Sequence, residues 1–134
     1  MKKFFLLLFI FPFISAQGGE KKVLVEVFTN SHCGVCPGAY NALASYRNNN
    51  PANAAKLNYI YYHMSYPYPD DPLNQANTVD PQARNQYYGP FTSTPRAFFR
   101  GATQTNSYSG WPALLNTAVA EQSPLEISLH GTVS

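Results

Sequence analysis

Two cysteines, three positions apart, stand where an apolar stretch of the chain gives way to a helical one. Cys33 and Cys36 are the only cysteines among 134 residues. The preceding stretch, Lys22–Thr29, is rich in β-branched residues and apolar on both faces, which predicts a buried central strand. From Cys36 onward, a helix with one apolar face is predicted by the spacing of Ala39, Leu43 and Tyr46. Cys33 therefore falls at or before the start of a helix that follows a strand and a turn.

This placement allows three interpretations of the pair. A structural disulfide between residues so close in sequence restricts the unfolded chain only a little. A metal site would recruit His32 and His63, and this soft ligand set suits Cu(I) or zinc, but the chain has no second close cysteine pair for a closed tetrahedral site. A redox pair fits best, because a helix N-terminus stabilises a thiolate at Cys33 and Cys36 lies close enough to resolve a mixed disulfide. We therefore predict thiol chemistry, with no bound metal and no cofactor.

The first residues are expected to be a targeting signal. Lys2 and Lys3 precede the apolar run Phe4–Ile14, and the small residues Ser15 and Ala16 follow it. This order is typical of a secretory signal peptide (residues 1–16) cut near Ala16. A membrane anchor is the alternative, but the run is too short to cross a ~30 Å hydrocarbon core. The sequence thus predicts export to the periplasm, the outer-membrane surface or the extracellular space, where disulfides persist.

The composition excludes two classes of protein. Only 12% of the residues are charged and 15% are aromatic, which argues against a disordered chain. When Lys2 and Lys3 leave with the signal peptide, seven basic residues balance seven acidic ones. A chain with no net charge and no basic run offers no surface to nucleic-acid phosphates. We expect its partners among protein or small-molecule thiols and disulfides.

Patterns in the rest of the chain predict one α/β domain. Further strands are expected at Leu57–His63 and Arg96–Arg100, followed by a short one at Thr103–Tyr108 that pairs back. A strand–helix–strand start implies a crossover between parallel strands, and the later hairpin adds antiparallel ones. The predicted fold is therefore a three-layer α/β arrangement, in which helices flank a mixed sheet of about four strands.

Helices between and after these strands are predicted from caps and periodicity. Asp71-Pro72 and Asp80-Pro81 each resemble a helix cap followed by proline at the first helical position, so we expect one or two short helices between Leu73 and Tyr88. A last helix is expected at Pro112–Gln122, and its inner face would contain Leu114, Leu115, Ala118 and Val119.

The end of the chain has the pattern of a strand. Apolar and polar residues alternate over Leu125–His130. We expect this segment, within residues 124–134, to begin a downstream β-rich part that is truncated at Ser134; pairing within the same domain is the alternative. The domain itself is expected to span residues 17–123.

Longer stretches of the sequence resemble the thioredoxin superfamily, most closely its secreted, outer-membrane-associated members. The resemblance is carried by LVEVFTNSHCGVCPGA, YYHMSYPYPDDP, ARNQYYG and STPRAFFRG, which together cover about Val23–Gly101. It implies a thioredoxin-like fold with a helical insertion before a cis-proline, for which Thr94-Pro95 is the candidate. In longer relatives it also implies further domains for cell-surface attachment or sorting.

Pattern and resemblance together give roles to individual residues. Cys33, as the more exposed thiol of the turn, is the predicted nucleophile, and Cys36 is the resolving thiol. A cis Pro95 would expose the Thr94 backbone for strand-like pairing with a substrate peptide. Glu26 either lies beneath Cys36 as a proton acceptor of raised pKa or points to an exposed edge, and the resemblance favours the first.

Two histidines and the overall function complete the predictions. His32 either stabilises the thiolate when protonated or is a solvated turn residue, and His63 is expected to serve structure rather than catalysis. The leading hypothesis is an exported thiol–disulfide oxidoreductase that uses Cys33 and Cys36. The alternative is a non-catalytic thioredoxin-like binding or spacer module of a larger cell-envelope protein, with a permanent disulfide.

Overall fold

The apolar run after Lys22 forms strand β2 (Val23–Thr29), the centre of a four-stranded sheet. A computed structural model describes residues 19–104, 107–124 and 131. The strand order is β3-β2-β4-β5, in which β3 is Leu57–His63, β4 is Arg96–Phe99 and β5 is Ala102–Thr103. β2 and β3 are parallel, whereas β2–β4 and β4–β5 are antiparallel. The prediction of a mixed sheet of about four strands with helices is confirmed.

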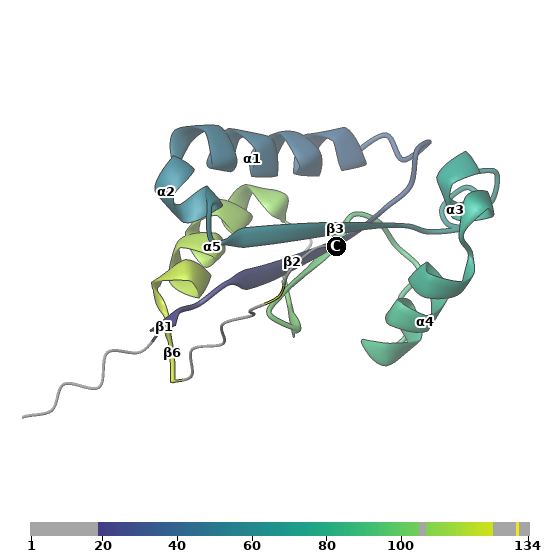
Figure 1. Cartoon of the computed structure of the whole chain (residues 1–134). Helices are drawn as coiled ribbons and strands as arrows, with labels where there is room; N and C mark the ends of the chain where they lie inside the picture. The colour runs from purple at the N-terminus through teal and green to yellow at the C-terminus, as the bar shows by residue number, and fades with distance from the viewer. Residues whose placement is uncertain (1–18, 105–106, 125–130, 132–134) are drawn as a thin grey trace, which may run out of the picture.

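Helices connect these strands and lie on both faces of the sheet (Figure 1). In chain order they are α1 (Cys36–Asn49), α2 (Pro51–Ala54), α3 (Pro72–Ala76), α4 (Val79–Tyr87), the 3-10 turn η1 (Tyr108–Gly110) and α5 (Trp111–Ala120). Prolines occupy the first turns of α1, α2, α3 and α5, where the missing N–H leaves no hydrogen bond unmade. α1 and α2 form the crossover from β2 to β3, and α3 and α4 form the predicted helical insertion before Pro95.

Strand alternation divides the core between the two faces of the sheet. On one face, Val25 and Val27 of β2 pack with Leu43 of α1 and with Trp111 and Leu115 of α5. On the other face, aromatic side chains dominate, and the buried cluster there consists of Phe28, Met64, Phe91 and Phe98. Since β2 is buried on both faces, it fixes the position of the turn that carries the cysteines.

Three local predictions are corrected by the structure. Asp80 is not a helix cap, because α4 begins at Val79 and Asp80 lies inside its first turn. A carboxylate in this position still interacts favourably with the helix dipole. The edge strand β5 (Ala102–Thr103) does not extend over Thr103–Tyr108 as predicted, because Tyr108 already begins η1. Leu114 does not face the core and is 38% exposed, since Trp111, Leu115 and Ala118 define the buried stripe of α5.

The two ends of the described domain meet in a short second sheet. β1 (Gly19–Glu20) pairs antiparallel with β6 (Gln122–Ser123), which no sequence pattern predicted. The predicted signal peptide and the predicted strand Leu125–His130 lie outside the described residues. Among the helices of the described residues, none has the length and apolar character needed to cross a bilayer.

Candidate functional site

Cys33 and Cys36 form a disulfide at the point where β2 passes into α1. Cys36 is the first residue of α1, and Cys33 lies in the turn before it. The turn is held by the backbone, since Cys33 N–H donates to the Asn30 carbonyl at 3.1 Å and Cys36 N–H donates to the Cys33 carbonyl at 3.3 Å. The predicted strand–turn–helix position of the pair is confirmed, and Cys36 lies at the N-terminal end of α1, where the helix dipole is positive.

Both cysteines are almost buried and both border one hollow of the surface. Cys33 is 5% and Cys36 is 6% exposed, so exposure does not single out Cys33 as the sequence argument expected. The hollow, here called the disulfide groove, has a volume of about 480 Å³. It is bordered by the disulfide, Pro95, Tyr40 of α1, and Tyr61 and His63 of β3. The assignment of Cys33 as the nucleophile stays a prediction.

The Thr94–Pro95 bond is cis, as predicted, and lies against the cysteine turn. Pro95 borders the disulfide groove together with Cys33 and Cys36. The Thr94 carbonyl oxygen lies 3.8 Å from Cys33 Sγ, so a reduced Cys33 thiol is placed to donate a weak hydrogen bond to it. Segments more than sixty positions apart in the sequence are thereby brought to the same site.

Glu26 does not serve the cysteines, which corrects the predicted proton acceptor beneath Cys36. It is completely buried, but it faces α4, on the opposite side of β2 from Val27 and the groove. Arg84 donates to its carboxylate from Nε at 2.5 Å and from Nη2 at 3.0 Å, and the Tyr88 hydroxyl donates as well. Burial alone would raise the pKa of Glu26, but these hydrogen bonds and the Arg84 charge outweigh it and hold the pKa below its ordinary value.

His32 lies at the rim of the turn and outside the disulfide groove. Its half-exposed ring is packed edge-on against Tyr68, and its Nε2 lies 3.9 Å from Asp70 Oδ2. Its backbone N–H donates to the Asn30 side chain at 2.9 Å. The carboxylate of Asp70 is thus the nearest opposite charge, and a role for His32 in stabilising a Cys33 thiolate stays a prediction.

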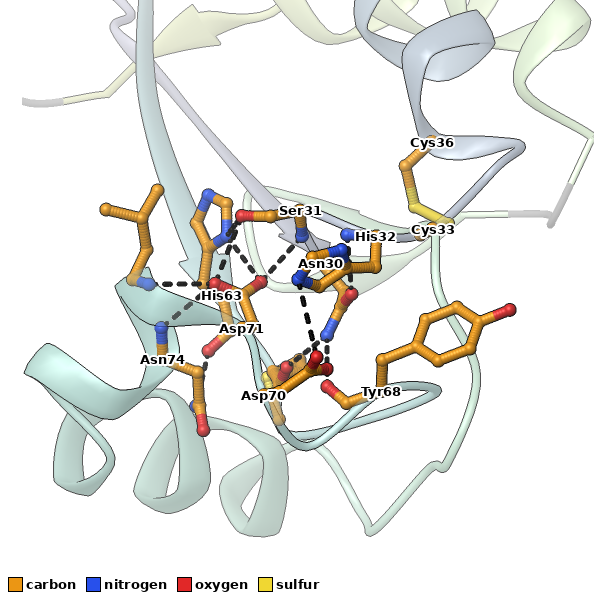
Figure 2. A network of polar contacts seen from close by, with 12 residues as sticks. Asn30, Ser31, His32, Cys33, Cys36, His63, Tyr68, Asp70, Asp71 and Asn74 are labelled. Atoms are coloured by element: carbon orange, nitrogen blue, oxygen red, sulfur yellow. Dashed lines mark hydrogen bonds and ion pairs between the residues drawn. A yellow bond between two sulfur atoms is a disulfide. The ribbon is translucent and has the colours of Figure 1, made fainter.

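Asp71 connects the cysteine turn to β3 and α3 (Figure 2). As predicted, it caps α3, accepting from the N–H groups of Leu73 at 2.8 Å and Asn74 at 3.2 Å. It also accepts from Ser31 N at 2.6 Å and Ser31 Oγ at 3.1 Å, and it pairs with His63 Nδ1 at 2.9 Å. Burial raises the pKa of the fully buried Asp71, but the hydrogen bonds, first of all the one from His63, hold it well below the ordinary value.

Asn30 makes the second connection between these segments. Its side-chain amide donates to the carbonyls of Met64 and Tyr68, both at 2.8 Å, and its carbonyl oxygen accepts from His32 N. The contacts of Asn30 with Met64 and Tyr68, and of Ser31 with Asp71, were not predicted, because these partners lie more than thirty positions away and leave no local signal. Together Asn30 and Asp71 fix the turn that presents Cys33.

The disulfide gives the groove a group that can undergo thiol exchange. Among the residues with described positions, no three His, Cys, Asp or Glu side chains gather in a way that would hold a metal ion. Apolar, aromatic and proline side chains border the groove beside the disulfide, and Thr29, Asn30, Ser31 and His63 add polar groups. Its shape and chemistry suit an apolar group that carries a thiol or a disulfide to the sulfurs.

No protein-family model, curated protein or solved structure matches this chain.

Proposed function

We propose that the chain is an exported, thioredoxin-like domain that exchanges thiols and disulfides through Cys33 and Cys36. The proposal is carried by one observation: a disulfide at the N-terminus of α1 borders an open groove together with Pro95. The strand order β3-β2-β4-β5 and the cis bond before Pro95 are both in keeping with the resemblance that the sequence suggests. The apolar run Phe4–Ile14 after two lysines supports export.

The exchange would follow the chemistry common to such pairs. A substrate thiolate attacks Cys33 Sγ, the S–S bond breaks, and its electron pair leaves on Cys36 as a thiolate. A second substrate thiolate then displaces Cys33, so the substrate departs as a disulfide and the pair is left reduced. The same steps in reverse reduce a substrate disulfide. The N-terminus of α1 favours the thiolate form of a sulfur beside it, and the Thr94 backbone would pair with an extended substrate peptide.

A non-catalytic module is the second candidate, and one observation favours it. Cys33 and Cys36 are each less than a tenth exposed, as expected for a disulfide that only fixes a turn. In that case the domain would act as a binding or spacer unit of a larger cell-envelope protein. The two candidates differ in whether physiological thiols can open the disulfide.

The reduction potential of the pair distinguishes the two. The chain without residues 1–16 would be equilibrated with mixtures of reduced and oxidised glutathione, and the free thiols would be alkylated and counted. Oxidoreductase function requires a potential clearly less negative than about −300 mV, whereas a value at or below this indicates a structural disulfide. A Cys33→Ser variant, which cannot form the bond, supplies the baseline for alkylation.

A further inference from the structure

His63 lies in the disulfide groove although the proposed exchange does not use it. It is the last residue of β3, and strand alternation places it on the same face as Tyr59 and Tyr61, which pack on the core beneath α1. The parallel register sets it beside Thr29, at the end of the strand that leads to the cysteines. Its side chain is 21% exposed and borders the groove that Cys33 and Cys36 also border. The groove thus joins a disulfide and an imidazole.

Asp71 determines which ring nitrogen of His63 is free. Asp71 Oδ2 lies 2.9 Å from Nδ1, and this carboxylate is fully buried and ionised, with further hydrogen bonds from Ser31, Leu73 and Asn74. An ionised carboxylate only accepts, so Nδ1 carries a proton and Nε2 is left as the basic nitrogen. Figure 2 shows Nδ1 turned toward Asp71 and the opposite edge of the ring directed away from it.

We propose that His63, oriented by Asp71, is the proton-transfer residue of the disulfide groove, and that it accepts the proton of a thiol bound there. This inference rests on the proposed function. The bound thiol gives its proton to His63 Nε2, directly or through one water in the groove. The resulting thiolate attacks Cys33 Sγ, and the electron pair of the S–S bond passes to Cys36. The protonated His63 then returns its proton to the groove, where the Cys36 thiolate takes it up. A second thiol of the same substrate completes the reduction, so the substrate class is a dithiol on an apolar carrier.

The polar and titratable groups around His63 come from several neighbouring elements. His63 faces Asp71, which lies just before α3, and Ser31 of the cysteine turn, whose Oγ lies 3.4 Å from His63 Nδ1. Tyr40 of α1 borders the same disulfide groove. On the outer side of His63 a separate hollow brings it near Tyr62 of β3 and Asp80 of α4. Asp71 is fully engaged by hydrogen bonds, so the imidazole, with its free ring nitrogen, is the side chain described in the groove that we assign to proton transfer.

The size of the effect follows from the ionisation of the thiol. An alkyl thiol with a pKa near 8.5 is only about 3% ionised at pH 7. A base that supplies the thiolate can therefore accelerate the attack by at most roughly thirtyfold at pH 7 and by less than about twofold at pH 9. A structural role for His63 would lower the rate by the same factor at both pH values, so the two roles are distinguishable.

The test uses dithiothreitol, a neutral dithiol, as the probe, and rapid alkylation of the released cysteines as the readout. We expect His63→Gln to react roughly tenfold to thirtyfold more slowly than the wild type at pH 7, and within about twofold of it at pH 9. Asp71→Asn should show a smaller loss with the same pH pattern, because the imidazole remains but its orientation is no longer fixed. Lys56→Gln is the matched control, because it also introduces glutamine but lies directly before the first residue of β3, at the opposite end of the strand from His63. It should react like the wild type.

Equal rates of His63→Gln and wild type at pH 7, or the same loss at pH 7 and pH 9, would overturn the role of His63 while leaving the proposed function intact. An equal pH-dependent loss in His32→Gln would overturn it too, since the other histidine would then move the proton. A wild-type disulfide that dithiothreitol does not open at either pH would instead overturn the proposed function, and the role of His63 with it.

Discussion

The ion pair between Glu26 and Arg84 tests how firmly α4 is attached to the sheet. Glu26 is fully buried, whereas the side chain of Arg84 is 32% exposed. Arg84→Met keeps a long side chain but leaves the Glu26 carboxylate without a cation. Removing one partner of a buried ion pair costs about 3–5 kcal/mol. The Tyr88 hydroxyl continues to donate to Glu26, so we expect a loss near the lower end, about 3 kcal/mol of unfolding free energy.

Urea unfolding at pH 7, followed by circular dichroism, would measure this loss in the wild type, in Arg84→Met, in Glu26→Gln and in the double variant. The double variant removes both charges and leaves none uncompensated. Its loss should therefore be smaller than the sum of the two single losses, by about 0.5–3 kcal/mol, the range found for residues in one network. This double-mutant cycle separates the energy of the Glu26–Arg84 ion pair from the packing energy of the aliphatic part of the arginine side chain.

The pH dependence supplies an independent check with a definite sign. In the wild type the pKa of Glu26 lies below its ordinary value of 4.5, so the contribution of the pair is complete above pH 4.5 and is lost as the pH falls. In Arg84→Met the buried carboxylate lacks its cation, which raises its pKa, and the variant should lose stability as the pH rises above 4.5. Equal stability of wild type and Arg84→Met at pH 7, or strictly additive losses, would refute this description.

Three further predictions concern the site and its supports. Because hydrogen bonds hold the pKa of Asp71 below its ordinary value of 3.8, its contribution to stability is present above pH 3.8 and is lost as the pH falls further; Asp71→Asn should flatten this part of an acid-unfolding curve, and an unchanged slope would contradict it. A Cβ at Gly38 would lie 2.5 Å from the Tyr108 hydroxyl, so Gly38→Ala should lower the unfolding free energy by about 1 kcal/mol, but raise it by about 0.5 kcal/mol when Tyr108→Leu has cleared the space. Leu115→Ala should cost about 3 kcal/mol in chemical denaturation and the exposed Leu114→Ala less than about 1 kcal/mol; similar losses would mean that the buried face of α5 is misassigned.

Local patterns predicted the elements whose residues determine their own conformation. β3 was predicted with the bounds that the structure gives, because Leu57–His63 is dense in residues that favour strands. The cap of α3 was predicted because Asp71 and Pro72 satisfy the helix start within the segment itself. The β1–β6 pairing was not predicted, because two-residue strands at opposite ends of the domain contain no periodicity to detect.

The parts of the candidate site that consist of residues close together in the sequence were predictable. The cysteine pair and Thr94-Pro95 are recognisable as short motifs. The surroundings of Glu26 were not predictable, because β2 is apolar on both faces and the sequence does not tell which face meets α1. The link from Asp71 to Ser31 and His63 depends on a loop folding back over the end of the sheet, so tertiary structure alone brings these three residues together.

Trapping the mixed disulfide tests the central claim most directly. Cys36→Ser leaves Cys33 unable to release a bound thiol, whereas Cys33→Ser removes the sulfur that is proposed to attack. Each variant would be mixed with a disulfide-bonded peptide carrying an apolar residue beside its cysteine, and the adducts would be quantified by mass spectrometry. We predict that Cys36→Ser accumulates a stable adduct at Cys33 and that Cys33→Ser forms little or none. Absence of an adduct in both variants, or a faster reaction at Cys36 than at Cys33, would contradict it.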